Sequence, residues 1–367
     1  MTNNIMRIEL AQKFFGQTEK LFFTTGDMKV STFRYNCGVC AIRLRNIKGE
    51  IIVLPFQGMQ IWDATFEGKR LTMKAMRERP VSTRSYLENF GAFFVHCGFT
   101  AMGVPGPEDS HVLHGEMHNA PFTDVYVLAC RDERGAYICI GGCYRHTIAF
   151  SADVLEECFV KLYEKETLIG IELNVSNLKR SSMEYMYMAH PDFRPIDGGK
   201  LVYSALCTPN NVRVRHSIPA HMKASREYGD LLASFQRSPE QHHVIQPGFR
   251  YDPEVVFFID RYLADEDGWA YSMMVHPDGY AYYVKHKPSE FEHVIRWICR
   301  TPDQDCLGIA LPATAEPEGY MAEKKKGNVK VMGPGQQLHF GIEVGLLAPA
   351  EAHGMVQKIE SMLATAR

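Results

Sequence analysis

The chain has 367 residues, of which 46% are hydrophobic and 23% are charged, and its formal net charge is −3. The near-neutral charge argues against a nucleic-acid-binding protein, which needs a concentrated basic surface. No apolar window approaches the roughly 20 residues of a membrane span. We therefore expect a soluble globular protein with neither nucleic acid nor membrane as a partner. The only basic run, residues 324–326, is short, and we interpret it as a solvated turn.

The N-terminus lacks the basic and then apolar segments of a secretory signal. Without an export signal, the ten cysteines are expected to be reduced and mostly buried, and the protein to be cytoplasmic. Cys37 and Cys40 have the spacing of a metal or redox pair, but no second pair accompanies them. Residues three apart on a strand point to opposite faces, so we predict no metal or redox cofactor here.

The N-terminal part is predicted to be an extension over residues 1–31, with a short helix at residues 5–15, where apolar residues recur at helical spacing. From about Thr32, short runs rich in Val, Ile, Phe, Tyr and Cys alternate with Gly, Pro, Asn and Asp. The lengths of the runs predict strands, and the separators predict turns, for example at residues 46–49 and 132–135.

The second half of the chain repeats this pattern, and helices are predicted only in two places. Residues 289–300 begin with a Ser and Glu placed as in a capping box, and residues 348–367 have the pattern of a closing amphipathic helix. Strands do not alternate with helices, which excludes a doubly wound sheet. Roughly twenty strands without a fixed repeat predict an all-β fold, one large antiparallel sandwich in a single domain over residues 1–367.

The most distinctive segment, residues 90–121, starts apolar, crosses a Gly/Pro-rich stretch and reaches His114 and Gly115. A glycine leaves the backbone bare, so a ligand can approach the neighbouring histidine closely. Glu116 and His118 crowd the same turn. We predict that His114 polarises a bound ligand, and the alternative is a turn histidine that caps a backbone carbonyl.

A second histidine, His190, ends a run with the pattern of a strand. The two tyrosines and two methionines of residues 185–188 fall on opposite faces of such a strand. Because Pro191 follows, His190 is held extended at a strand end, where catalytic groups often lie. A histidine can serve as a general acid near neutral pH. The alternative is an ordinary histidine in a surface turn.

Trp62 follows Gly58 and has polar neighbours, so its ring could form a platform for a sugar. The alternative is a tryptophan packed in the core of the sandwich. Arg34, Arg84 and Arg194 are close to these segments in sequence and could bind an acidic substituent of a sugar, because a guanidinium suits such groups.

Several segments together are similar in sequence to a known protein family. The most specific is Leu113-His114-Gly115 with its glycine-rich approach. The others, in chain order, are residues 58–62 with Gly68, residues 89–91 and 97–99, residues 119–121, the strand with His190, and residues 334–335. Together they resemble the aldose 1-epimerase (galactose mutarotase-like) superfamily, and in particular its branch known only as a domain of unknown function.

The resemblance implies a large antiparallel β-supersandwich with a carbohydrate site, a small-molecule carbohydrate as partner and no cofactor. The reaction it implies is anomer interconversion. A general base takes the proton of the anomeric hydroxyl, and a general acid protonates the ring oxygen. The ring then opens and closes on the other face. By similarity, His190 is the acid and His114 polarises the substrate. We expect further contacts with the sugar from His118, Trp62, Arg84, His96 and Asp192.

The sequence departs from the family pattern at the base. The family places a glutamate on a late strand, and the corresponding position here is Leu311, which cannot take a proton. Glu316, Glu318 or Glu343 could supply the carboxylate from a shifted position, and Glu316 is preferred because it is nearest in sequence.

The missing glutamate leaves a second hypothesis open, namely a sugar-binding protein that does not catalyse this reaction. A third hypothesis is a metal-dependent sugar isomerase. It is suggested by four histidines in one part of the chain, which are His96, His111, His114 and His118.

Overall fold

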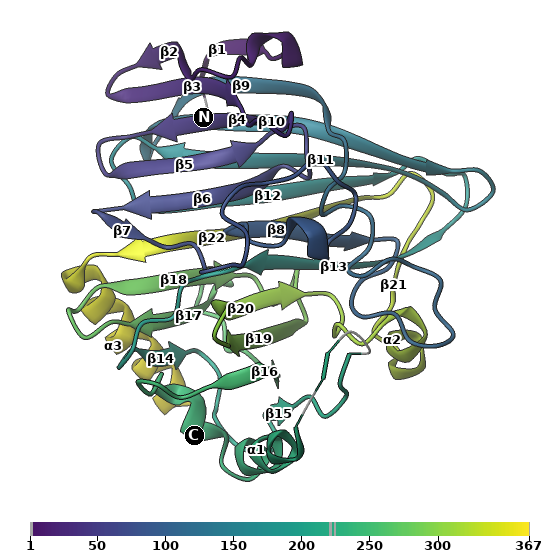
Figure 1. The fold of residues 1–367 in the computed structure, drawn as a ribbon, viewed down its shortest axis with the longest axis vertical. Coiled ribbons are helices and arrows are strands. Elements are labelled where there is room, and N and C mark those ends of the chain that lie inside the picture. Colours follow the sequence, from purple (N-terminus) through teal and green to yellow (C-terminus); the bar gives the residue numbers. More distant parts are fainter. Residues whose placement is uncertain (1–2, 220–221, 224, 367) are drawn as a thin grey trace.

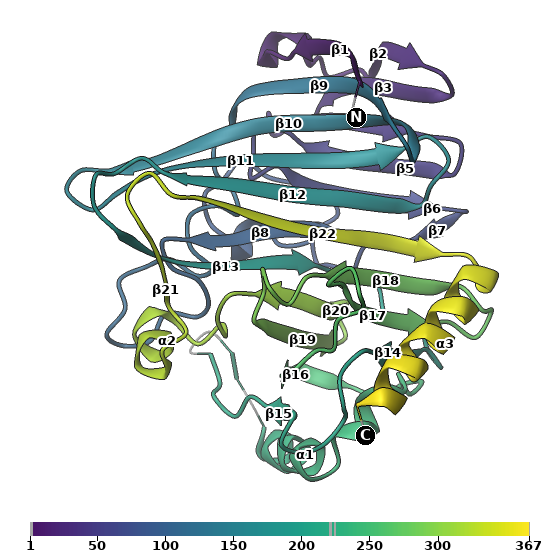
Figure 2. The ribbon, with the colours of Figure 1, turned by 180° about the vertical axis from the view of Figure 1, so that it is seen from behind.

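The computed structural model describes residues 3–219, 222–223 and 225–366. Two large antiparallel sheets lie one behind the other, with the 13-stranded sheet in front in Figure 1 and the 9-stranded sheet in front in Figure 2. The 9-stranded sheet has the order β1 (Asn3–Glu9), β9 (Thr123–Asp132), β10 (Gly135–Ile148), β11 (Ala152–Tyr163), β12 (Leu168–Asn177), β22 (Gln337–Leu347), β18 (Ala281–His286), β17 (Ala270–Val275) and β14 (Lys200–Tyr203).

The 13-stranded sheet carries the elements that later form the site. Its order is β15 (Val212–Val214), β16 (Tyr251–Ile259), β19 (His293–Arg300), β20 (Asp305–Ala313), β13 (Met183–Pro191), β8 (Phe94–Phe99), β6 (Gln60–Phe66), β5 (Gly49–Leu54), β4 (Cys40–Arg45), β3 (Met28–Arg34) and β2 (Lys20–Thr25). Two short strands extend it, because β21 (Lys330–Met332) pairs with β13 and β7 (Lys69–Arg70) pairs with β6. The prediction of a large antiparallel β-sandwich is confirmed.

The main core fills the space between the sheets. On β11, buried and partly exposed side chains alternate without a break, and Val154, Cys158 and Val160 point inward. Strict alternation is the pattern of a strand with one face on a core.

The 13-stranded sheet is buried on both faces near β13. Tyr185 and Tyr187 belong to the core between the sheets, whereas Met186 and Met188 belong to a second apolar cluster on the other face. The predicted division of these four residues is confirmed. His190 has the same parity as the methionines, so it shares the outer face with them.

Three helices complete the described residues: α1 (Arg226–Arg237), α2 (Tyr320–Lys326) and α3 (Pro349–Thr365), with single 3₁₀ turns at η1 (Gln12–Phe14), η2 (Leu87–Asn89) and η3 (Pro239–His243). The predicted C-terminal helix is confirmed as α3. It lies across the outer face of the 9-stranded sheet and buries Ala352 and Ile359 against it (Figure 2). No helix that the structure describes has the length and apolar character needed to cross a bilayer.

Two helix predictions are wrong. Within residues 289–300 the chain forms β19, which pairs with β16 and β20. Its side chains alternate between the two faces of the sheet. Ile295 and Trp297 point to the outer face, and Val294, Arg296 and Ile298 point to the inner face. Near the N-terminus, residues 5–9 of the predicted helix belong to β1, which pairs with β9, and only the 3₁₀ turn η1 at residues 12–14 is helical. In both places the sheet partner outweighs the local pattern.

The lysine run is also not a turn. Residues 324–326 form the end of α2, and each lysine makes an ion pair. The acidic partners are Glu184 for Lys324, Glu108 for Lys325, and Glu316 together with Glu323 for Lys326. The prediction of one domain over residues 1–367 stays a prediction.

Candidate active site

A cavity of 1110 Å³ opens on the outer face of the 13-stranded sheet. Its size suits a small molecule. Four neighbouring strands form the floor with side chains that share the outer face: Glu254 and Val256 from β16, Ile295, Trp297 and Cys299 from β19, Leu311 from β20, and Met188 and His190 from β13. Loops supply the walls, with residues 76–79, 86–88 and 113–114, and with Phe90, Val104, Arg215 and Pro317.

His190 is a buried histidine on the floor, with 5% of its surface exposed. Its Nδ1 lies 3.1 Å from Oδ2 of Asp192, which is fully buried. Because a carboxylate accepts, Nδ1 carries the proton and Nε2 is the nitrogen left for a ligand. Asp192 also accepts a hydrogen bond from Sγ of Cys306 at 3.3 Å. This pair has the arrangement in which an acidic side chain orients a catalytic imidazole.

His114 comes from the loop that the sequence singled out. Its φ is +59°, an uncommon value for a residue with a side chain. The turn is held because the His114 N–H donates to the carbonyl of Gly103 at 3.0 Å and the His114 carbonyl accepts from the N–H of Gly98 at 2.9 Å. Strained backbone of this kind often occurs at functional sites.

The His114 ring lies among other rings, 4.7 Å from Tyr86 and 5.9 Å from His190 between centroids. Its Nδ1 is buried and has no hydrogen-bond partner among the described residues. Burial lowers the pKa of His114 well below its usual range, and the nearby His190, His118 and Arg215 lower it further. The ring is therefore neutral and presents Nε2 to the cavity.

Tyr86 was not predicted from the sequence. It lines the cavity, and its ring also packs against Phe90 and His118 at 5.5 and 5.2 Å between centroids. Burial raises the pKa of the Tyr86 hydroxyl well above its usual range. The hydroxyl thus stays protonated and can donate a hydrogen bond to a ligand.

Glu254 and Arg215 form a buried ion pair in the cavity, with 5% and 7% of their surfaces exposed. One carboxylate oxygen of Glu254 accepts from Arg215, and the other accepts from Nε1 of Trp297 at 2.5 Å. The Trp297 ring lies 5.8 Å from the His190 ring. An indole, a carboxylate and a guanidinium side by side are suited to hold the faces and hydroxyls of a sugar.

Sequence reasoning missed these three residues as well, although a signal was present for Trp297. Residues 293–300 alternate in a way that places Ile295, Trp297 and Cys299 on one face of a strand. Because residues 289–300 were predicted to form a helix, this strand face and its Trp297 were not recognised. Glu254 offers a weaker signal, since it is one polar residue at the start of an apolar strand.

Two predicted contacts lie in the protein interior rather than in the cavity wall. Trp62 is buried in the apolar cluster beneath the site, and its Nε1 donates to the carbonyl of Glu78 at 3.2 Å. Trp62 therefore lies neither in the cavity wall nor in the core between the sheets, because its cluster is on the outer face of the 13-stranded sheet. His96 is fully buried on β8, with Nδ1 2.8 Å from the hydroxyl of Tyr187.

Two further residues predicted to contact the sugar, Arg84 and His118, instead lie outside the cavity and bind the backbone near the His114 loop. Arg84 binds the carbonyls of Asn119 and Glu116 at 2.7 and 2.9 Å. His118 is buried, and its Nε2 lies 3.1 Å from the carbonyl of Arg84. Neither lines the cavity. Asp192 does not line it either but reaches it through His190.

The structure does not bring Glu316 to the cavity, and this corrects the preferred position of the base. Its carboxylate accepts from Arg213 and Lys326, each at 2.5 Å. Burial raises the pKa of Glu316, but these two cations outweigh it and the pKa is lowered. Glu316 therefore has its charge satisfied outside the site, whereas Leu311 does lie on the cavity floor.

The two other glutamates considered for the base also lie outside the wall. Glu318 accepts from the hydroxyl of Ser217, at 2.9 and 3.0 Å to its two oxygens, and its Oε1 lies 3.8 Å from Arg215. Glu343 is on β22 in the other sheet, paired with Arg134 and with Lys285.

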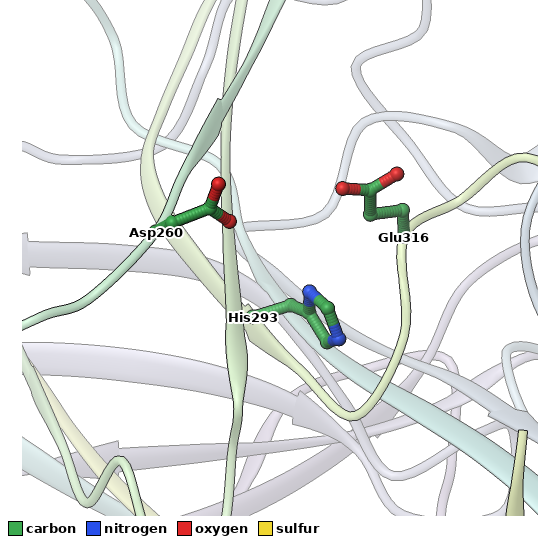
Figure 3. A group of neighbouring side chains, drawn as sticks. All are labelled: Asp260, His293 and Glu316. Carbon is green, nitrogen blue, oxygen red and sulfur yellow. The ribbon is translucent and has the colours of Figure 1, made fainter. Parts of the chain in front are cut away.

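Figure 3 shows the one group of three potential metal ligands among the described residues, Asp260, His293 and Glu316, whose ligand atoms lie within 4.8 Å of one another. Arg213 donates to Asp260 at 2.9 Å and to Glu316 at 2.5 Å. A metal ion would have to displace this guanidinium. None of the three lines the cavity. The four histidines behind the metal-isomerase hypothesis do not form such a group in the part of the chain described.

A family model described as a domain of unknown function, DUF4432, matches residues 36–346. The chain belongs to this family. The match runs from just before β4 into β22 and so includes every residue that lines the cavity. A search of curated protein sequences gave no match.

Solved structures with the same fold have low sequence identity. A Klebsiella pneumoniae protein provisionally named an aldose 1-epimerase aligns with a TM-score of 0.77 and 17% identity, over 97% of this chain and 91% of its own. A galactose mutarotase-like protein of Clostridium acetobutylicum aligns with a TM-score of 0.55 and 12% identity, over 88% and 99%. The galactose 1-epimerase of Lactobacillus acidophilus aligns at 0.50 and 11%, over 90% and 98%. The predicted fold, that of galactose mutarotase-like proteins, is confirmed.

Proposed function

We propose that the protein is a carbohydrate isomerase of the aldose 1-epimerase kind, which interconverts the anomers of a sugar in the cavity. One observation carries the proposal. His190, hydrogen-bonded to the buried Asp192, lines a cavity of 1110 Å³ beside the half-buried ring of Trp297. The structures with the same fold include proteins named as epimerases of sugars, and this supports the choice of substrate class.

The chemistry needs only proton transfers. His190 donates a proton from Nε2 to the ring oxygen while a base takes the proton of the anomeric hydroxyl. The bond between C1 and the ring oxygen then breaks. Asp192 accepts from Nδ1 and stabilises the imidazolium form, as an acidic residue does in a catalytic triad. Trp297 offers its face to the pyranose, and Glu254 with Arg215 binds hydroxyls and fixes the orientation.

The test is anomer exchange measured by saturation-transfer NMR over a panel of neutral and acidic sugars. We expect at least one sugar to exchange faster than in buffer, and we expect His190→Ala to remove most of the gain. General acid–base groups typically contribute about 10²–10⁴-fold. Unchanged exchange in a folded His190→Ala variant would contradict the proposal.

A sugar-binding protein without this activity is the second candidate, because Leu311 lies on the floor where the family pattern expects a carboxylate. It predicts saturable binding, seen as line broadening of one sugar, with no exchange above the rate in buffer.

A further inference from the structure

We infer that His114 is the general base of this site and replaces the glutamate that is missing at Leu311. The inference rests on the proposed function, because it assigns the second proton transfer of the same reaction. It also changes the role of His114, from a group that polarises the substrate to one that accepts a proton.

Geometry is the first argument. The rings of His114 and His190 lie 5.9 Å apart between centroids, at an angle of 79°, and both line the cavity. The anomeric oxygen and the ring oxygen of a pyranose are bonded to the same carbon, so the acid and the base must reach two neighbouring atoms. Two imidazoles at this separation can address both atoms from one side of the sugar.

The hydrogen bonding of His114 is the second argument. Its buried Nδ1 has no partner in the described part of the chain, so no neighbour fixes which nitrogen carries the proton. The ring can therefore keep Nδ1 protonated and Nε2 free as a base. A carboxylate fixes the proton of His190 on Nδ1, whereas no such group constrains His114.

The environments of the two histidines are the third argument. Burial lowers the pKa of His114 well below its usual range and so keeps the ring neutral. His190 instead has the carboxylate of Asp192 beside it, which can stabilise an imidazolium. The two histidines thus differ in what lies beside the ring, since His190 has a hydrogen-bonded carboxylate and Nδ1 of His114 has no hydrogen-bond partner among the described residues.

The proton transfers balance. Nε2 of His114 takes the proton of the anomeric hydroxyl while protonated His190 gives its proton to the ring oxygen. The C1–O bond of the ring breaks, and C1 becomes an aldehyde. After the aldehyde rotates, His190 takes back the ring-oxygen proton, that oxygen attacks the other face of C1, and His114 returns its proton. The net charge of the site is unchanged throughout.

Glu254 is the competing base, and its contacts argue for a binding role. Both of its oxygens already accept hydrogen bonds, one from Arg215 and one from Trp297. The Trp297 ring contacts His190 on one side and Glu254 through its N–H. Glu254 is thus linked to the His190 ring through Trp297, whereas the His114 ring packs against the His190 ring itself.

The test uses two variants suited to the left-handed backbone at position 114, because Asn and Gly tolerate positive φ better than other residues. His114→Asn keeps a side chain that can hydrogen-bond but cannot take a proton, and we expect it to lose about 10²–10⁴-fold in kcat. His293→Asn is the control outside the cavity, with unchanged kcat. Glu254→Gln tests the competing base, and we expect it to raise KM more than it lowers kcat. A His114→Asn variant that keeps its kcat would overturn the inference.

Chemical rescue separates a base from a polarising donor. Small imidazoles of graded basicity are added to His114→Gly, in which glycine leaves space in the cavity. We expect exchange to return and to rise with the basicity of the imidazole. Rescue that falls with basicity would show that His114 donates a hydrogen bond instead. Wild-type protein with no exchange of any sugar would overturn the proposed function as well, whereas exchange that needs His190 but not His114 overturns this inference alone.

Discussion

Two groups of polar side chains meet on the 13-stranded sheet, one in the cavity around His114, His190 and Glu254 and the other around Glu316, and they differ in how their charges are satisfied. Glu254 on β16 and Trp297 on β19 face the cavity. At the other end of these strands, Asp260 and His293 meet Glu316 (Figure 3).

In the second group, Arg213 binds both carboxylates and Lys326 also binds Glu316. In the cavity, Nδ1 of His114 is unpaired within the described residues and Nε2 of His190 is left for a ligand. The comparison shows that residue type alone does not mark a catalytic group. A side chain that transfers protons needs a lone pair or a proton that no neighbour binds, and it must be able to contact the ligand. Cations that bind a carboxylate occupy its lone pairs and block this contact.

The largest contrast is expected between the two histidines of these groups. His190→Ala should lower turnover by about 10²–10⁴-fold, because it removes the acid, whereas His293→Ala should leave turnover within about threefold of wild type. Exchange NMR measures both, and circular dichroism checks that each variant is folded. Equal losses in the two variants would mean that the groups do not differ in function.

Asp192→Asn tests how the carboxylate supports His190. The amide cannot replace the charge and can turn its N–H toward Nδ1, which would move the ring proton to Nε2 in the resting state. We expect kcat to fall by about 10–10²-fold with little change in KM. The pH profile of kcat should shift as well, and a profile identical to wild type would rule out this role for Asp192.

Glu316→Gln tests the ion-paired group and should act on stability. The loss of charge-assisted hydrogen bonds to two half-exposed cations should cost about 1–2 kcal/mol, less than for a fully buried pair because water screens them. Urea unfolding measures this cost, and turnover should not change.

The same variant predicts a pH dependence. The pKa of Glu316 is lowered below its ordinary 4.5 in the folded protein. The ionised group therefore stabilises the fold above that pH, and the stabilisation is lost as the pH falls through the lower folded pKa. The stability difference between wild type and Glu316→Gln should shrink below about pH 4.5. A difference that is constant from pH 7 to pH 3 would contradict the assignment.

The smallest effect is expected for Trp297→Phe, which keeps an aromatic ring but removes the N–H donated to Glu254. A hydrogen bond to a charged group is worth about 1.5–3 kcal/mol net. Glu254 keeps its bond from Arg215, so we expect only about 1 kcal/mol to be lost from sugar binding, which raises KM about fivefold while kcat holds. Sugar titrations followed by NMR give the comparison. A fall in kcat without a change in KM would instead place the indole in the chemical step.

Much of the fold could be predicted because period-2 patterns depend on local sequence. The runs of β-branched and aromatic residues gave the strands, and the alternation in residues 185–188 gave the two faces of β13. The same pattern placed His190 on the outer face. The pattern failed in residues 289–300, where an apparent capping box hid an alternating strand that β16 and β20 complete.

The sequence by itself determined a large antiparallel β-sandwich and singled out His114 and His190, both of which line the cavity. Their roles stay predictions. Only the tertiary structure decided which carboxylates are paired with cations. Glu316, for example, binds Arg213, which is more than a hundred residues away in sequence. It also assembled Glu254, Arg215 and Trp297 from three separate strands and loops. The local sequence pattern determines on which face of the sheet a side chain lies. Its contacts with residues distant in sequence determine whether its charge is paired and whether a ligand can reach it.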